Sequence, residues 1–287
     1  MRTTIRQLRA MKSRGDKIPM ITAYDYTSAA IVDRAGIPVI LVGDSLGQVI
    51  LGYDSTLSVT MEDLIYHARP VIRGALDAQV VVDMPFMSYQ GGPEIALHNA
   101  GRLLKEGGAQ AVKLEGGIPV AESVRKIVEA GIPVMGHIGL TPQSQNQLGT
   151  RVQGKTVVKA MELIDQAVTL EQAGAYSIVL ELVPAELAEL ITERLSVPTI
   201  GIGAGACCDG QVLVFHDLLG LYIDKDFKHS RRYATLADDA VNAVSAYSSD
   251  VREGSFPSVE ESHNMDREVF EQLLIKLKDN VSTDGNH

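Results

Sequence analysis

Short apolar runs alternate along this chain with longer stretches whose apolar residues recur at helical spacing. Runs of four to six residues rich in Val, Ile and Leu are typical of strands buried in a parallel sheet. The stretches between them mostly end at glycine, the common stop signal of a helix. The pattern predicts eight strands, over residues 18–23, 39–42, 80–82, 111–115, 134–138, 177–180, 199–202 and 212–215.

Strands separated by helices imply right-handed βαβ units and an α/β fold with a parallel sheet. Eight such units predict one (β/α)8 TIM barrel over residues 1–257, with a doubly wound open sheet as the alternative. A short helix over residues 4–11 precedes the first strand. The eighth strand follows the seventh too closely for a helix between them, and a helix over residues 235–252 is expected to complete the ring.

The remaining residues, 258–287, form a C-terminal extension. Apolar side chains of residues 266–281 fall on one stripe of a helix. We expect this extra C-terminal helix to dock on the barrel or on a neighbouring subunit. Residues 282–287 are predicted to be disordered.

The net charge and the two cysteines limit the classes of function and the cellular compartments that we expect for this protein. The 287 residues carry a net charge of −10, which argues against a general binder of nucleic acid or anionic membranes. No apolar run approaches the ~20 residues that span a bilayer. The two cysteines, Cys207 and Cys208, are adjacent and form no disulfide framework, which fits a reducing compartment. We therefore expect a cytoplasmic protein. The basic N-terminus leaves an organelle transit peptide as the less favoured alternative.

Four acidic residues each close an apolar run: Asp44, Asp83, Glu115 and Glu181. Parallel barrels place their ligands at this end of the strands, so the acids are expected at one rim, although each could instead cap the following helix. Asp44, Asp83 and Glu115 follow neighbouring strands. Three oxygen ligands suit Mg²⁺, which a 2-oxo acid could also chelate. A structural ion pair with Lys113 is the alternative.

Four further features complete the candidate site. Lys113 alternates with Leu114 and is predicted to face inward, where it would balance the acids or bind a substrate carboxylate, with a Schiff base as the rival role. His137 could be an ordinary core histidine, but the glycines on either side leave space around it and favour a functional role. Glu181 is expected across the barrel from the other acids as a general base, and a metal with a base suits proton removal beside a carbonyl. The glycines of residues 201–205 could cradle a phosphate.

Several long motifs together resemble the ketopantoate hydroxymethyltransferase family over residues 20–257. The resemblance lies in Gly43-Asp-Ser-Leu-Gly47, Asp83-Met-Pro-Phe-Met-Ser-Tyr-Gln90, Val112-Lys-Leu-Glu-Gly-Gly117, Gly136-His-Ile-Gly-Leu-Thr-Pro-Gln-Ser144, Gly201-Ile-Gly-Ala-Gly205 and Cys208-Asp-Gly-Gln-Val-Leu-Val214. It implies a barrel of the phosphoenolpyruvate/pyruvate type. The implied reaction moves a hydroxymethyl group from 5,10-methylenetetrahydrofolate to 3-methyl-2-oxobutanoate. The product is 2-dehydropantoate (ketopantoate), in pantothenate and coenzyme A synthesis, and the reaction passes through a Mg-stabilised enolate.

The resemblance also implies a role for each candidate residue. It implies one Mg²⁺ per subunit on Asp44, Asp83 and Glu115, and Glu181 as the catalytic base. The substrate-binding residues that it implies are Asp44, Ser45, Asp83, Lys113 and His137. It further implies a homodecamer. It does not identify the residues that contact the folate.

This chain departs from the family pattern at two places. Gly149-Thr150 stands where family members have Gly-Gly-Tyr, and Ala206 stands where they have proline. Both departures lie in loops. We expect them to affect the shape of these loops and the affinity for the folate donor, but not the residues that carry out the reaction.

Two other classes of function are weighed against this one. A lyase acting on 2-oxo acids in the same barrel superfamily would carry a Lys-Lys-Cys-Gly-His loop, which this sequence lacks. A non-catalytic barrel that binds a ligand or scaffolds an assembly gives no reason for four acids at strand ends.

Overall fold

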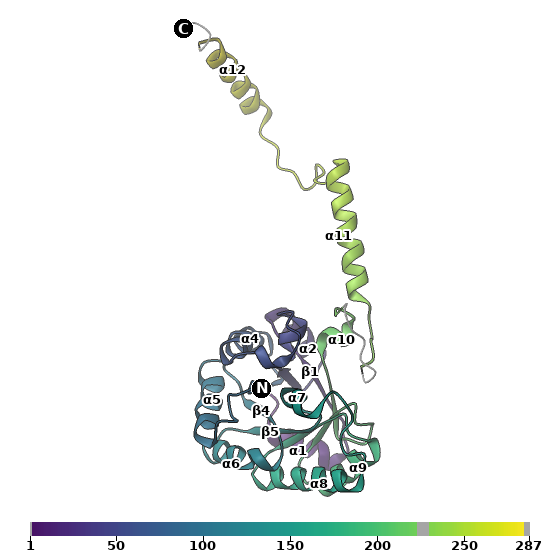
Figure 1. Cartoon of the computed structure of the whole chain (residues 1–287). Coiled ribbons are helices and arrows are strands. Elements are labelled where there is room, and N and C mark those ends of the chain that lie inside the picture. The colour runs from purple at the N-terminus through teal and green to yellow at the C-terminus, as the bar shows by residue number, and fades with distance from the viewer. Residues whose placement is uncertain (1, 223–229, 284–287) are drawn as a thin grey trace. The chain divides into compact units, whose positions relative to one another are not determined.

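Eight parallel strands form a closed barrel in the order of the sequence, with β8 paired to β1 (Figure 1). The computed structural model describes residues 2–222 and 230–283. The strands are β1 Ile18–Thr22, β2 Val39–Val42, β3 Gln79–Asp83, β4 Ala111–Glu115, β5 Val134–Gly139, β6 Ser177–Glu181, β7 Thr199–Ile202 and β8 Gly210–Leu213. The predicted (β/α)8 barrel is therefore confirmed, and the doubly wound alternative is wrong.

Helices connect the strands and surround the barrel (Figure 1). The long ones are α2 Tyr26–Arg34, α4 Met61–Gly74, α5 Pro93–Lys105, α6 Ala121–Glu129, α8 Val157–Gln172 and α9 Ala185–Arg194. Asp25 and Thr60 begin α2 and α4 with capping boxes, in which each side chain accepts a hydrogen bond from a backbone amide of the first turn. Short helices α3 Leu46–Val49 and α7 Gln145–Leu148 lie within segments expected to be loops.

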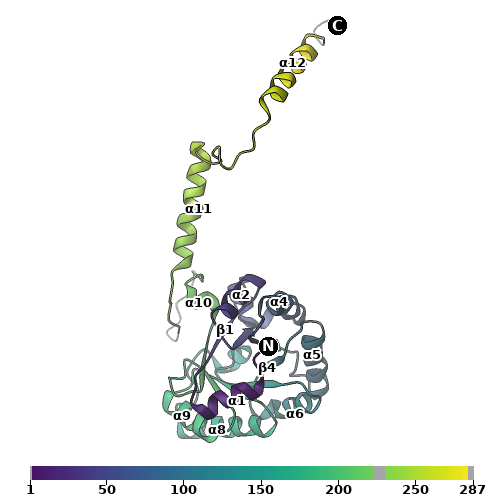
Figure 2. The ribbon, with the colours of Figure 1, turned by 180° about the vertical axis from the view of Figure 1, so that it is seen from behind.

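Alternate residues of each strand build two apolar layers. In β2, Val39 and Leu41 belong to the cluster inside the barrel, whereas Ile40 and Val42 belong to the cluster between sheet and helices. Helix α1 (Ile5–Arg14) adds Leu8, which is 2% exposed, to the inner cluster, and Figure 2 shows this helix across the barrel. The inner core is thus covered at one end, and the carboxyl ends of the strands are left for function.

The eighth strand begins two residues earlier than predicted and ends earlier too. Gly210 pairs with Ile18, and a Cβ atom on Gly210 would lie 2.2 Å from the Ile18 carbonyl oxygen, so only glycine fits there. Phe215, expected to end the strand, instead begins α10 (Phe215–Leu219). Its backbone N–H donates to Thr22 Oγ1 at 2.9 Å. As predicted, no helix lies between β7 and β8.

The chain divides into two compact units, residues 1–235 and residues 236–287. The second unit contains α11 (Leu236–Glu253) and α12 (Arg267–Thr283), so the helix predicted over residues 266–281 is confirmed. None of the residues of α11 is buried. That this helix completes the ring, within a domain ending at 257, stays a prediction. Of the end expected to be disordered, residues 282–283 are helical and 284–287 lie outside the described residues. No described helix has the length and apolar character to cross a membrane.

Candidate active site

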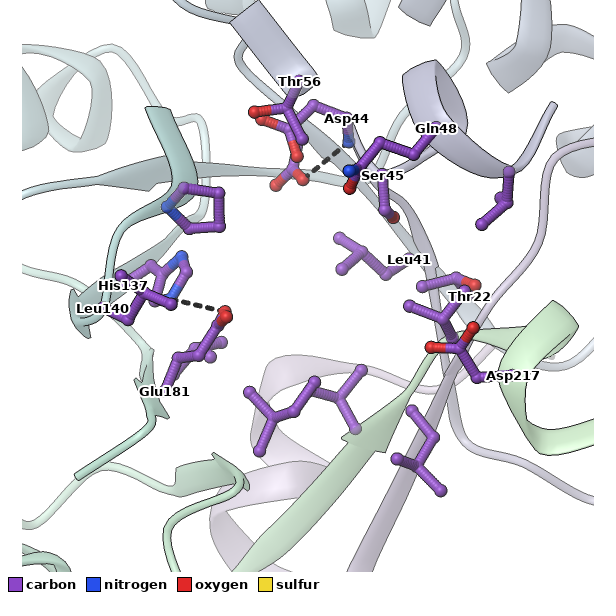
Figure 3. Close-up of a pocket in the computed structure, with 18 of the residues that line it drawn as sticks. Thr22, Leu41, Asp44, Ser45, Gln48, Thr56, His137, Leu140, Glu181 and Asp217 are labelled. Atoms are coloured by element: carbon purple, nitrogen blue, oxygen red, sulfur yellow. Dashed lines mark hydrogen bonds and ion pairs between the residues drawn. The ribbon is translucent and has the colours of Figure 1, made fainter. Parts of the chain in front are cut away.

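The four strand-end acids line a single cavity of about 600 Å³ (Figure 3). Asp83, Glu115 and Glu181 are the last residues of β3, β4 and β6, and Asp44 lies two residues beyond β2. Ser45, Lys113 and His137 line the same cavity. The structure therefore brings together all seven residues that the sequence suggested for metal binding, substrate binding and proton transfer.

Lys113 lies among three of these carboxylates. Its Nζ forms an ion pair with Asp83 Oδ1, and the Asp44 backbone N–H donates to Asp83 Oδ2 at 3.0 Å. Burial alone would lower the pKa of Lys113, but the charges of Asp83, Asp44 and Glu115 raise it. An amine held protonated in this way is a poor nucleophile, which argues against the Schiff-base role.

His137 lies between Glu115 and Glu181. Its Nδ1 is 3.5 Å from Glu115 Oε1, and its Nε2 is 3.3 Å from Glu181 Oε2 (Figure 3). Burial would lower the pKa of His137, but these two carboxylates raise it to about 9, so the ring is a cation at neutral pH. In the closed strand order, β6 with Glu181 lies opposite β2, which Asp44 follows, so the expected place of Glu181 across the barrel agrees with the topology for Asp44. The imidazole of His137 in addition connects Glu181 with Glu115.

Gln143 forms hydrogen bonds to Asp44 and Glu115, and its role was not predicted from the sequence. Its backbone N–H donates to Glu115 Oε2 at 3.0 Å, and its Nε2 donates to Asp44 Oδ2 at 2.8 Å. Its Oε1 accepts from the Tyr89 hydroxyl at 2.7 Å, and that hydroxyl accepts from the Glu115 N–H at 3.1 Å. Gln143 is 4% exposed. One buried residue thus binds two of the three predicted metal ligands, Glu115 through its backbone and Asp44 through its side chain.

Ser45 is held at the start of α3 by a neighbouring strand end. Its Oγ lies 2.8 Å from the hydroxyl of Tyr24, a residue that is 1% exposed. A Cβ atom on Gly43 would lie 3.0 Å from Ser45 Oγ and 3.3 Å from Asp83 Oδ2. Glycine at position 43 therefore gives the space that this close grouping needs.

The donor set fits a magnesium ion. Asp44, Asp83 and Glu115 are each at most 5% exposed, and burial together with the charges of Asp83 and Glu115 raises the pKa of Asp44 well above its ordinary value. A divalent cation would offset this crowding of negative charge. Within the described part of the chain, no group of three or more His, Cys, Asp or Glu side chains is arranged to hold a metal ion by itself. Mg²⁺ does not require such a group, because it usually keeps waters or substrate oxygens beside one or two carboxylates.

Comparison with known proteins decides the family. The family model described as ketopantoate hydroxymethyltransferase matches residues 2–259. The chain belongs to the ketopantoate hydroxymethyltransferase family. The 3-methyl-2-oxobutanoate hydroxymethyltransferase of Dehalococcoides mccartyi strain CBDB1 is 59% identical over 274 residues, which cover 95% of this chain and 98% of that protein. The protein of the same name from Clostridium novyi strain NT is 54% identical over 274 residues, covering 95% and 100%.

Solved structures with much lower identity share the barrel. A phosphoenolpyruvate phosphomutase from Streptomyces platensis subsp. rosaceus superposes with a TM-score of 0.60 at 17% identity, covering 97% of this chain and 98% of that one. A 2,3-dimethylmalate lyase of the PEP mutase/isocitrate lyase superfamily gives a TM-score of 0.57 at 16% identity, covering 99% and 98%. These structures show the fold expected of a ketopantoate hydroxymethyltransferase.

Loops beyond the strand ends hold the remaining candidates. The glycines of residues 201–205 lie where side chains would be crowded: a Cβ atom on Gly201 would lie 3.0 Å from Cys208 Sγ, and one on Gly205 would lie 2.5 Å from Ala185 Cβ. That they cradle a phosphate stays a prediction. Of this segment only Ile202 lines the cavity. Thr150, one of the two departures from the family pattern, does line it.

Proposed function

We propose that this chain transfers a hydroxymethyl group from 5,10-methylenetetrahydrofolate to 3-methyl-2-oxobutanoate, giving 2-dehydropantoate for pantothenate and coenzyme A synthesis. One observation carries the proposal. A chain of the ketopantoate hydroxymethyltransferase family gathers Asp44, Asp83, Glu115, Lys113 and His137 in one cavity with Glu181. A metal ion on the oxygen ligands can polarise the substrate carbonyl, and the two cations can bind the substrate carboxylate. The further carboxylate can then remove the proton from the carbon beside the carbonyl.

In this proposal, the buried residues of the cavity bind the metal ion and the 2-oxo acid. Mg²⁺ held by Asp44, Asp83 and Glu115 would polarise the 2-oxo group as a Lewis acid. Lys113 and His137 are both protonated at neutral pH and 5% or less exposed, so they supply positive charge for the substrate carboxylate. Ser45 adds a hydroxyl to the same cavity next to Asp44. The substrate is thereby oriented with its C3 atom toward the open part of the cavity.

Glu181 is the base in this proposal. Its side chain is 16% exposed, whereas that of Glu115 is 2% exposed, so Glu181 has the access that a group taking a proton from a ligand needs. Water adds its oxygen to the one-carbon unit of the donor, both C–N bonds to the folate break, and tetrahydrofolate leaves with formaldehyde released into the cavity. The C3 proton then moves to the carboxylate of Glu181, C3 forms a bond to the formaldehyde carbon, and the former carbonyl oxygen takes up a proton to become the hydroxyl group. His137 Nε2 lies 3.3 Å from Glu181 Oε2 and holds this carboxylate in position.

Proton NMR in D₂O tests both halves of the reaction. With Mg²⁺ and enzyme, the C3 proton signal of 3-methyl-2-oxobutanoate should decay, and a hydroxymethyl signal should follow when methylenetetrahydrofolate is added. Glu181→Gln should slow both by ~10²-fold or more, the usual contribution of a general base, while Mg²⁺ still binds. The control is Glu186→Gln, at an exposed carboxylate in the first turn of α9.

Two outcomes would contradict the proposal. Full activity of the Glu181→Gln variant would remove Glu181 from its role. A folded, Mg²⁺-loaded wild-type enzyme that shows neither exchange nor product would remove the function.

The same family resemblance supports a cytoplasmic homodecamer. Exposed apolar residues of α11 favour contact with another copy of the chain, among them Val241, Val244, Tyr247 and Val251. Light scattering on a sizing column should give a decameric mass, and a monomeric mass would remove this part of the proposal.

A further inference from the structure

The hydroxyl of Ser45 does not do what a serine at the start of a helix usually does. Such a serine accepts a hydrogen bond from a backbone N–H of the first turn. Ser45 makes no such bond to α3, and its Oγ lies instead 2.8 Å from the hydroxyl of Tyr24. Ser45 lines the cavity, across the open space from Glu181 (Figure 3). A side chain from the end of another strand therefore holds the hydroxyl that faces the ligand.

Tyr24 is fixed in place behind Ser45. It is 1% exposed and is not among the residues that line the cavity. Its backbone N–H donates to Ser28 Oγ at 3.3 Å, and its carbonyl oxygen accepts from His67 Nδ1 at 2.7 Å. Its ring contacts the ring of His216, with 5.6 Å between the two centroids. A side chain held at its backbone and at its ring presents its hydroxyl in one place.

The Tyr24 hydroxyl belongs to a row of three. Burial raises the pKa of Tyr24 above its ordinary value, although hydrogen bonds with Ser45 and Thr22 lower it, so this hydroxyl keeps its proton at neutral pH. Thr22 is the last residue of β1, and its Oγ1 accepts from the Phe215 N–H at 2.9 Å. The row thus begins at a backbone donor and ends at Ser45 in the cavity wall.

We propose that Tyr24 is a positioning residue that directs the Ser45 hydroxyl at the 2-oxo acid, an inference that rests on the proposed function. A hydroxyl group has one proton to donate and can accept from two donors. In this row each hydroxyl accepts from the group before it, so Thr22 donates to Tyr24 and Tyr24 donates to Ser45. The proton of Ser45 is then left for an oxygen of the acid, and hydrogen bonds in such a chain strengthen one another.

Loss of the Tyr24 hydroxyl would leave Ser45 in place but without direction. Its Oγ could then turn to the backbone amides of α3, the ordinary partners of a serine at a helix start. The phenylalanine ring of Tyr24→Phe keeps the packing against His216. The variant therefore separates the direction of the serine hydroxyl from its presence.

Calorimetric titration of 3-methyl-2-oxobutanoate into the Mg²⁺-loaded enzyme tests this role without turnover. Tyr24→Phe should bind the acid about five- to tenfold more weakly than the wild type, the loss expected from one hydrogen bond. Ser45→Ala should weaken binding at least as much. In the double variant, Tyr24→Phe should add less than about twofold to the effect of Ser45→Ala, because the residue through which it acts has lost its hydroxyl.

Two controls separate this role from general loosening of the core. Tyr176→Phe also removes a buried phenol hydroxyl, which donates to Gln79 Oε1 at 3.0 Å in the inner core, and it should leave the acid affinity unchanged. Titration of Tyr24→Phe with Mg²⁺ alone should give the affinity of the wild type.

The outcomes distinguish this inference from the proposed function. Wild-type acid affinity of Tyr24→Phe would overturn the positioning role and leave the function. So would an equal effect of Tyr24→Phe with and without the Ser45 hydroxyl, an equal loss in Tyr176→Phe, or a parallel loss of Mg²⁺ affinity. A wild type that binds no 2-oxo acid in the presence of Mg²⁺ would remove the proposed function, and this inference with it.

Discussion

Gln143→Met tests how far one buried amide organises the candidate metal site. Methionine keeps the length of the side chain and removes its polar atoms. The variant loses the donor to Asp44 at 2.8 Å, the donor to the Met84 carbonyl at 3.0 Å and the acceptor for the Tyr89 hydroxyl at 2.7 Å. The backbone hydrogen bond from position 143 to Glu115 remains, so the change isolates the side chain.

The expected magnitude follows from these contacts. A hydrogen bond to a charged group contributes about 1.5–3 kcal/mol, and a buried donor left unsatisfied costs about 1–3 kcal/mol. Loss of the bond to Asp44, with the Tyr89 hydroxyl left without this acceptor, should lower the free energy of unfolding by roughly 3 kcal/mol. Loss of a side chain that orients a ligand typically weakens metal affinity by about 10- to 100-fold.

Two measurements check this prediction. Calorimetric titration with Mg²⁺ gives the affinity, and urea unfolding of the metal-free protein gives the stability. The control is Gln147→Met, at an exposed glutamine of α7 in the same loop. If Gln143→Met binds Mg²⁺ and unfolds as the wild type does, the hydrogen bonds of Gln143 do not organise the site, and the reasoning fails.

Two further changes probe the scaffold away from the site. Leu8→Ala opens a cavity in the inner core and should lower the free energy of unfolding by about 2–4 kcal/mol. The kcat of the variant should be unchanged, because Leu8 does not line the active-site cavity. A large loss of kcat in the still-folded variant would contradict this separation of core and site. Burial of Asp33 opposes its ionisation, but the backbone donors of residues 76–78 and the charge of Arg2 hold the pKa of Asp33 below its ordinary value. The stability it contributes is therefore present above its unfolded pKa of about 3.9 and is lost as the pH falls through the lower folded pKa. Urea unfolding at about pH 6 and about pH 3 should show a smaller pH dependence for Asp33→Asn than for the wild type, and an equal dependence would refute the assignment.

Much of the barrel could be predicted because its strands are short runs of Val, Ile and Leu between glycine-terminated helices. The eighth strand was misplaced for a physical reason. Gly210 and Gln211 have no strand-like pattern, and their pairing with Ile18 and Pro19 of β1 places them in the sheet. The apolar Phe215 extends the run in sequence, but a hydrogen bond to Thr22 ends the strand there.

The candidate site was predicted in its residues but not in its connections. Strand ends identify Glu115 and Glu181, but the stagger of a barrel decides which neighbour each one meets. Glu115 pairs in register with His137, whereas Glu181 pairs with Gly139. The role of Gln143 comes entirely from tertiary contacts of a loop, which has no periodic pattern to read.

The single imidazole between Glu115 and Glu181 has an evolutionary consequence. A substitution at either carboxylate changes the charge that the same ring faces, so its effect depends on which residue stands at the other position. Adaptation of this barrel to a new acceptor would therefore proceed by paired replacements. The effect of a single replacement at one carboxylate would differ between sequence backgrounds that carry different residues at the other position.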